Sequence, residues 1–167
     1  LTASPDDEAV LVRVAEGYAQ AGRPERGLAA IEARGAARAL GRAALDLGRR
    51  LALGLGQPRR ALALATGARQ APRAGELTSL IDLALMAGDL PAARRLAARL
   101  PGGEARARDL ALMAADVPGA IAAQERLLAR RPDPMEAARL ASLHLQADRP
   151  DRALAALEAH APGRDRA

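Results

Sequence analysis

The stretch AGRPERGLAAIEA at residues 21–33 returns, with few changes, as ADRPDRALAALEA at residues 147–159. Both copies hold an Arg-Pro step, an acidic-Arg pair and the same spacing of apolar residues. Weaker copies begin at Leu55, Ala87 and Ala114. One small residue follows the turn in each copy, at successive intervals of 34, 32, 27 and 33 residues: Gly27, Ala61, Ala93, Ala120 and Ala153. A motif that recurs at such a period indicates five tandem repeats.

Each copy also carries one proline ahead of its small residue: Pro24, Pro58, Pro91, Pro118 and Pro150. Proline is tolerated in the first turn of a helix, because its missing N–H would have no partner there and its fixed φ suits the helix. A run of helical period precedes each proline. In the first repeat the apolar residues recur at i, i+3, i+4 and i+7: Leu11, Val14, Ala15 and Tyr18. Each repeat is therefore predicted to be a pair of helices.

The sequence predicts ten helices and no strand. Asp133 and Glu136 flank Pro134 as an Asp-x-x-Glu capping box at the start of the ninth helix. The core must consist of Ala, Leu, Val, Ile and Met, because the chain has one tyrosine and no tryptophan or phenylalanine. The predicted helices cover residues 6–21, 24–34, 37–54, 58–70, 74–87, 91–100, 103–114, 117–130, 135–147 and 150–161.

The composition excludes several classes of protein. The chain has no cysteine, which excludes a disulfide scaffold and a thiolate metal site. Arginines interrupt every apolar run, so no stretch reaches the roughly 18 apolar residues of a spanning helix, and we expect no membrane insertion by this segment. The chain begins with Leu1 and shows no secretory leader pattern, so we expect it to be a piece of a longer protein.

These repeats resemble the tetratricopeptide repeat (TPR), a helix–turn–helix of about 34 residues. The first repeat matches the large, small, aromatic and turn positions of that family: Leu11, Val14, Ala15, Tyr18, Gly22, Gly27 and Ile31. The fifth repeat matches it too, with a histidine in the usual tyrosine position: Ala137, Leu140, Ala141, His144, Ala153 and Leu157. The third repeat keeps the small residues Ala84 and Ala93. The second departs from the pattern at Arg49, and the shortened fourth is expected to pack its first helix irregularly.

The resemblance implies an all-α fold, an α-α superhelix of about five stacked helix pairs. We expect one domain over residues 1–161 and a disordered tail over 162–167. The first helices of such an array line a concave groove, and its open ends expose apolar residues that neighbouring repeats would cover. Both surfaces are candidates for partner binding. The five predicted repeats span about 4–35, 36–71, 72–101, 102–132 and 133–161.

The groove positions of the predicted first helices carry charged and polar residues, which form a candidate partner-binding stripe: Arg13, Glu16, Gln20, Arg50, Asp82, Arg106, Asp109, Arg139, Ser142 and Gln146. An alternative interpretation is that oppositely charged residues three apart, such as Arg13 with Glu16 and Arg106 with Asp109, only solvate the helix surface.

The sequence shows no catalytic or metal-binding pattern. The two histidines, His144 and His160, fall on different predicted helices, and we expect packing and surface roles for them. HExxH and Gly-x-Ser-x-Gly motifs are absent, and none of the 20 acidic residues stands in an evident apolar pocket. The glycine-rich stretches 53–58 and 101–106 lack the lysine of a phosphate loop. We therefore predict no enzyme activity, no cofactor and no bound metal.

A nucleic-acid binder is the main rival class. The net charge is +5, and all 25 basic residues are arginine, with four adjacent pairs: Arg49-Arg50, Arg59-Arg60, Arg94-Arg95 and Arg130-Arg131. These arginine doublets are interleaved with acidic residues and lack aromatic side chains on which bases could stack. The sequence favours another protein as the partner and no nucleic acid.

The alanine- and arginine-rich, cysteine-free style of the repeats also resembles the periplasmic repeat regions of bacterial exopolysaccharide export proteins of the Pel and cellulose type. That resemblance implies a periplasmic segment of an outer-membrane-anchored protein that recruits a polysaccharide hydrolase or deacetylase. The alternative is a cytoplasmic TPR adaptor or assembly factor.

Overall fold

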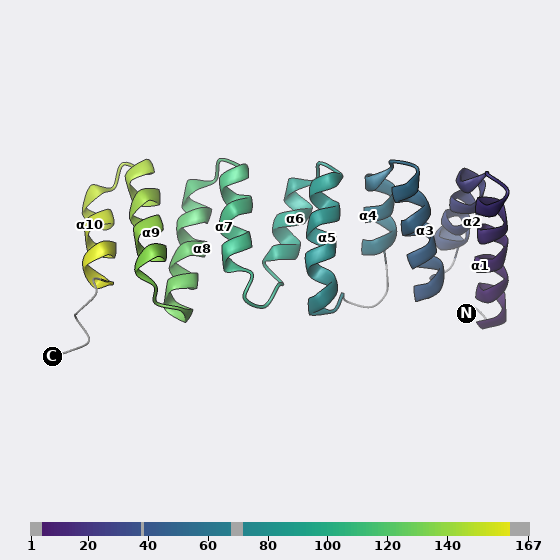
Figure 1. The fold of residues 1–167 in the computed structure, drawn as a ribbon, viewed down its shortest axis with the longest axis horizontal. Coiled ribbons are helices and arrows are strands. Elements are labelled where there is room, and N and C mark those ends of the chain that lie inside the picture. Colours follow the sequence, from purple (N-terminus) through teal and green to yellow (C-terminus); the bar gives the residue numbers. More distant parts are fainter. Residues whose placement is uncertain (1–4, 38, 68–71, 161–167) are drawn as a thin grey trace. The chain divides into compact units, whose positions relative to one another are not determined.

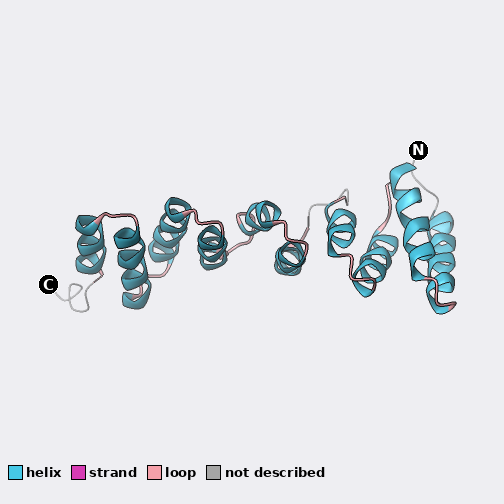
Figure 2. Cartoon of the chain, turned by 90° about the horizontal axis from the view of Figure 1, so that it is seen from above, coloured by secondary structure: helices cyan, strands magenta, loops and turns pink. Residues whose placement is uncertain are grey.

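The computed structural model describes residues 5–37, 39–67 and 72–160, and these contain α-helices and no strand (Figure 2). The predicted all-α class and the ten helices are confirmed within these ranges. The predicted tail at 162–167 lies outside the described residues. The helices are α1 (Pro5–Gln20), α2 (Pro24–Ala37), α3 (Arg42–Gly54), α4 (Pro58–Thr66), α5 (Ala74–Met86), α6 (Leu90–Ala97), α7 (Glu104–Met113), α8 (Val117–Arg130), α9 (Pro134–Gln146) and α10 (Pro150–Ala159) (Figure 1).

Five similar turns connect α1 to α2, α3 to α4, α5 to α6, α7 to α8 and α9 to α10. In each, one residue adopts a left-handed conformation with positive φ, and the spacing of these turn residues reproduces the predicted period: Gly22, Gly56, Gly88, Ala115 and Asp148. The following residue donates its N–H to the carbonyl five residues back, as Arg23 does to Tyr18 at 2.9 Å. This hydrogen bond is that of the Schellman motif, which ends the first helix of each repeat. A proline then occupies the first or second position of the second helix of each repeat, as predicted.

Some helix boundaries differ from the prediction, most clearly between α2 and α3. Helix α3 begins at Arg42, where residue 37 was expected, because the backbone is extended at Gly41. The carboxylate of Glu8 on α1 accepts hydrogen bonds from the N–H groups of Gly41 (3.1 Å) and Ala44 (3.4 Å). The first turn of α3 is thus capped by a side chain 33 residues away, which local sequence patterns do not reveal.

The helices form two compact units, Leu1–Asp89 with α1 to α5 and Leu90–Ala167 with α6 to α10, called unit 1 and unit 2 below. The division falls inside the predicted third repeat, between α5 and α6. One continuous domain over 1–161 stays a prediction.

Unit 1 is built around small residues at the helix contacts. Ala15 of α1, Ile31 of α2 and Leu47 of α3 form a buried cluster. Gly27 is buried so close to α1 that a Cβ atom on it would lie 2.6 Å from the backbone oxygen of Ala15. Its assignment as a small packing position is confirmed. The small residue of α3 is the buried Gly48, whereas its neighbour Arg49 pairs with Asp46 at the surface.

Unit 2 has a core of alanine, leucine and isoleucine from α7 to α10, which lie side by side in Figure 1. The short α7 packs regularly, with Leu110 and Ala111 buried, so the irregular packing expected for the fourth repeat is not seen. Two other assignments are wrong: Val14 in unit 1 is 46% exposed and Leu157 is 44% exposed. Leu11 and Tyr18 of the first repeat are half-buried. The other small and packing positions of the resemblance are buried as predicted: Ala15, Gly27, Ile31, Ala84, Ala93, Ala137, Leu140, Ala141, His144 and Ala153.

Candidate functional site

The ten residues of the predicted stripe all belong to first helices. In unit 1, α1 carries Arg13, Glu16 and Gln20, α3 carries Arg50, and α5 carries Asp82. In unit 2, α7 carries Arg106 and Asp109, and α9 carries Arg139, Ser142 and Gln146. Most of these side chains are exposed, while others, such as Glu16 and Arg106, are half-buried.

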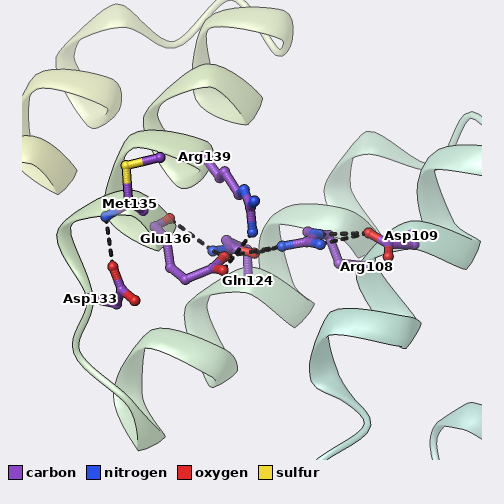
Figure 3. A network of polar contacts seen from close by, with 7 residues as sticks. All are labelled: Arg108, Asp109, Gln124, Asp133, Met135, Glu136 and Arg139. Atoms are coloured by element: carbon purple, nitrogen blue, oxygen red, sulfur yellow. Dashed lines mark hydrogen bonds and ion pairs between the residues drawn. The ribbon is translucent and has the colours of Figure 1, made fainter.

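In unit 2 a polar network ties α7, α8 and α9 together (Figure 3). The Arg108 guanidinium of α7 donates to Gln124 Oε1 of α8 at 2.9 Å and to Glu136 Oε2 of α9 at 3.1 Å. The amide of Gln124, which is fully buried, donates to the Glu136 backbone oxygen at 2.8 Å and to its carboxylate at 2.9 Å. The buried amide thus has partners at both its oxygen and its nitrogen, as burial requires.

The network extends outward to two residues of the predicted stripe, Asp109 and Arg139. Asp109 accepts from Arg108 at 2.8 Å, and Arg139 donates to Glu136 at 2.6 Å. The two arginines balance the two carboxylates, so the cluster has no net charge. Asp109 and Arg139 therefore take part in the contacts between helices and also face solvent. The other stripe residues of α9, Ser142 and Gln146, are exposed and lie outside this network.

Sequence analysis missed Arg108, Gln124 and Glu136 as a group. Glu136 was expected to close a capping box with Asp133, but its carboxylate points to Arg108, Gln124 and Arg139. Asp133 does cap α9 by accepting from the Met135 N–H at 2.8 Å. A signal for the network existed: the ninth residue after the turn residue is glutamine only in the fourth repeat and apolar in the others, as at Ile31.

A second feature missed from the sequence is exposed apolar residues beside the polar stripe. Leu112 and Met113 of α7 and Leu145 of α9 are exposed, two or three residues before the turn residue of their repeat. They lie three or four residues from Asp109 and from Ser142, and therefore share a helix face with them. We call these six residues the α7–α9 strip: Asp109, Leu112, Met113, Ser142, Leu145 and Gln146. Unit 1 exposes Leu53 and Met86 at the same positions of α3 and α5.

Many arginine side chains form ion pairs with carboxylates. One member of each predicted doublet forms an ion pair: Arg49 with Asp46, Arg60 with Glu32, Arg94 with Asp116, and Arg130 with Glu104. The Gly119 N–H and then Arg94 lower the pKa of Asp116, and the hydrogen bond from Arg130 lowers the pKa of Glu104. These pairings reduce the positive charge that the doublets could offer to phosphates.

The described residues hold no group of three or more His, Cys, Asp or Glu side chains placed to bind a metal. His144 is buried in α9, in the position that the resemblance gives to a tyrosine. His160 Nδ1 lies 3.1 Å from the Ala156 carbonyl oxygen. Within the described ranges, no helix is both long enough and apolar enough to cross a membrane.

No family model matches the sequence, and no curated protein matches it. Among solved structures, the chain is similar to the crystal structure of a thermophilic TPR protein from Thermus thermophilus, with 22% identity over 94% of this chain and 93% of that one. The TM-score is 0.35. At this TM-score the likeness carries no argument about fold or function.

Proposed function

We propose that this chain is a non-catalytic scaffold that binds another protein, and that unit 2 binds it through the α7–α9 strip. The observation that carries the proposal is the exposure of Leu112, Met113 and Leu145 among polar residues on two helices that the Arg108–Glu136 pair holds together. Apolar side chains among hydrogen-bonding ones are what a protein partner can cover and orient.

The strip could contribute useful affinity. Covering one leucine or methionine side chain is worth about 1.5–3 kcal/mol when burial is complete. Ser142 and Gln146 add donors and acceptors that can fix the register of the partner. Because Arg108 and Glu136 are already paired, the helices that carry the strip need little ordering on binding, which lowers the cost of association.

For the biological setting we propose a periplasmic segment of an exopolysaccharide export protein, with a polysaccharide hydrolase or deacetylase as the partner. The support is the composition of the repeats, which is alanine- and arginine-rich and free of cysteine. The cytoplasmic adaptor or assembly factor is the alternative setting. Binding of nucleic acid is less favoured, because one member of each arginine doublet is already paired with a carboxylate.

The test uses the double variant Met113→Ser with Leu145→Ser, and Met135→Ser as matched control, because Met135 is similarly exposed but lies at the other end of α9. Wild type and variants are used as bait in periplasmic and cytoplasmic extracts, and the captured protein is then purified and titrated. We expect the double variant to lose affinity by at least about tenfold, which corresponds to roughly 1.4 kcal/mol, and the control to retain it.

The extract that supplies the partner decides the setting. A periplasmic hydrolase or deacetylase supports the export proposal, and a cytoplasmic protein supports the adaptor. Equal affinity in the double variant and the wild type would show that the strip does not bind. Recovery of RNA or DNA without protein, with a steep dependence on salt, would favour the nucleic-acid class.

A further inference from the structure

The chain uses methionine only at its surface. Its three methionines, Met86, Met113 and Met135, have exposed fractions of 65%, 64% and 68%. Methionine is ordinarily among the residue types that are most often buried. Here leucine, isoleucine and alanine form the buried clusters of both units instead. The thioether sulfurs are therefore carried by side chains that solvent reaches.

This exposure belongs to the repeat and not to the ends of the chain. The second residue before the turn residue is exposed in every repeat, as Gln20, Gly54, Met86, Met113 and Gln146. Met135 stands earlier in its helix, and the equivalent residues of two inner helices, Ala43 of α3 and Gly75 of α5, are exposed as well. Neighbouring repeats therefore leave the methionine positions uncovered.

The three methionines hold all the sulfur of the chain, because it has no cysteine. Exposed methionine reacts with peroxides to give methionine sulfoxide. One peroxide oxygen forms a bond to the thioether sulfur while the O–O bond breaks, so the sulfur loses two electrons and hydrogen peroxide becomes water. Methionine sulfoxide reductases reverse the step with two electrons from a dithiol, which becomes a disulfide, and the oxygen leaves as water.

The position of Met113 accepts a polar side chain. Its equivalents in the first and fifth repeats, Gln20 and Gln146, are exposed amides. Glutamine and methionine sulfoxide have unbranched side chains of similar length, and each carries an oxygen on its δ atom. Oxidation of a buried methionine disrupts a core, but Met113 lies outside the core. A sulfoxide at this position should therefore change the surface of α7 and leave the fold intact.

We propose that Met113 is a reversible oxidation site, and that peroxides convert the α7 part of the α7–α9 strip from apolar to polar. Met113 adjoins Leu112 and lies four residues from Asp109 on the same helix face. The sulfoxide oxygen is a strong hydrogen-bond acceptor, so a partner that covers Met113 loses an apolar contact and must desolvate a polar group. The modification itself is independent of the strip's function, whereas its effect on a partner rests on the function proposed above.

The first experiment measures the oxidation of each methionine in the full chain. Hydrogen peroxide is added in a concentration series, and sulfoxide is quantified by mass spectrometry of peptides cut after arginine, which separate the methionines into 74–94, 109–126 and 131–139. We expect Met113 to react within about threefold of the rate of N-acetylmethionine amide, because susceptibility follows exposure. The circular dichroism and the melting temperature should stay those of the reduced chain, and the reductases with a dithiol should restore the original mass.

Three outcomes would overturn the proposal. They are protection of Met113 by more than about tenfold relative to the free amide, loss of helix when Met113 is oxidised, and a sulfoxide at residue 113 that the reductases do not remove. Each is read from the purified chain alone, without any partner.

Two matched variants test the effect on binding. Met86→Leu with Met135→Leu keeps Met113 as the single methionine, and Met113→Leu keeps the other two. The probe is the purified protein that the reduced wild type captures in the assay described above. After oxidation the first variant should bind this protein at least about tenfold more weakly, whereas the second should bind it as before. Met113→Gln should imitate the sulfoxide and bind weakly without peroxide.

The two proposals fail in different ways. If Met113→Ser with Leu145→Ser binds like the wild type, the function proposed for the strip fails and takes the effect on binding with it, while the mass spectra alone decide the oxidation site. If that variant loses affinity but the chain oxidised at Met113 binds normally, the redox effect is overturned and the function of the strip stands.

Discussion

Replacement of Gly27 by alanine tests the closest helix contact in unit 1. The added Cβ would lie 2.6 Å from the Ala15 backbone oxygen and 3.3 Å from Leu51 Cδ1. The oxygen belongs to the backbone of α1, so relief requires a shift of one helix against the other. Overpacking of this kind costs about 1–3 kcal/mol. Alanine in place of glycine inside a helix gains roughly 0.8–1.0 kcal/mol. The free energy of unfolding should therefore fall by about 0–2 kcal/mol.

Gly17→Ala is the matched control, because Gly17 is helical, exposed and has no atom within 4 Å of its would-be Cβ. It should stabilise the protein by about 1 kcal/mol through helix propensity alone. The difference between the two substitutions isolates the packing cost at Gly27, since propensity cancels. Urea unfolding is followed by circular dichroism and by the fluorescence of Tyr18, which is the chain's single aromatic residue and reports on α1. Equal stabilisation by both substitutions would refute the close approach of α1 and α2.

Three further predictions concern unit 2. Ala115→Gly should stabilise it by about 0.5–1 kcal/mol, because Ala115 has positive φ, whereas Ala129→Gly at an exposed position of α8 should cost about 1 kcal/mol in the same urea assay. Asp116 has a lowered pKa, so its charge stabilises the fold above the ordinary carboxyl pKa and ceases to do so as pH falls through the lowered value. Asp116→Asn should flatten the acid limb of a stability–pH curve. Gln124→Leu should cost about 1–3 kcal/mol by leaving buried partners unsatisfied, and an unchanged melting temperature would contradict this.

The sequence predicts this fold well because the signals of a helix-pair repeat are local. The first-turn prolines and the left-handed glycine at Gly22 follow from backbone geometry within a few residues. The small residue Gly27 meets the neighbouring helix α1, but it is recognised locally because a small residue recurs at the same place after each turn. The predictions are wrong where residues far away in the sequence determine a helix boundary or the exposure of a side chain. The start of α3 depends on Glu8 of α1, and the exposure of Val14 depends on which helix packs beside it. Neither is encoded in the neighbouring sequence.

The candidate site was only partly predictable for the same reason. The helical period places Ser142 and Gln146 on the stripe of α9, away from its buried residues, and the structure leaves both outside the buried core. Whether they bind a partner stays a prediction. The period brings Arg139 within reach of Glu136, which stands three residues earlier on the same helix face. It cannot reveal that Gln124 links three helices, because those contacts join residues on different helices. The exposure of Leu145 could be inferred only from its place before the turn residue, because leucine itself favours burial.

The polar network also bears on the binding surface proposed for the shortened fourth repeat. Helix α7 has ten residues, of which Leu110 and Ala111 are buried, and the polar network adds to this apolar packing. Arg108, anchored by Gln124 and Glu136, supplies directional bonds that apolar contacts lack, and these bonds set the register of α7 against α8 and α9. The same bonds join the helices that carry the α7 and α9 parts of the strip. Loss of the network should therefore weaken partner binding even where the strip residues themselves are unchanged.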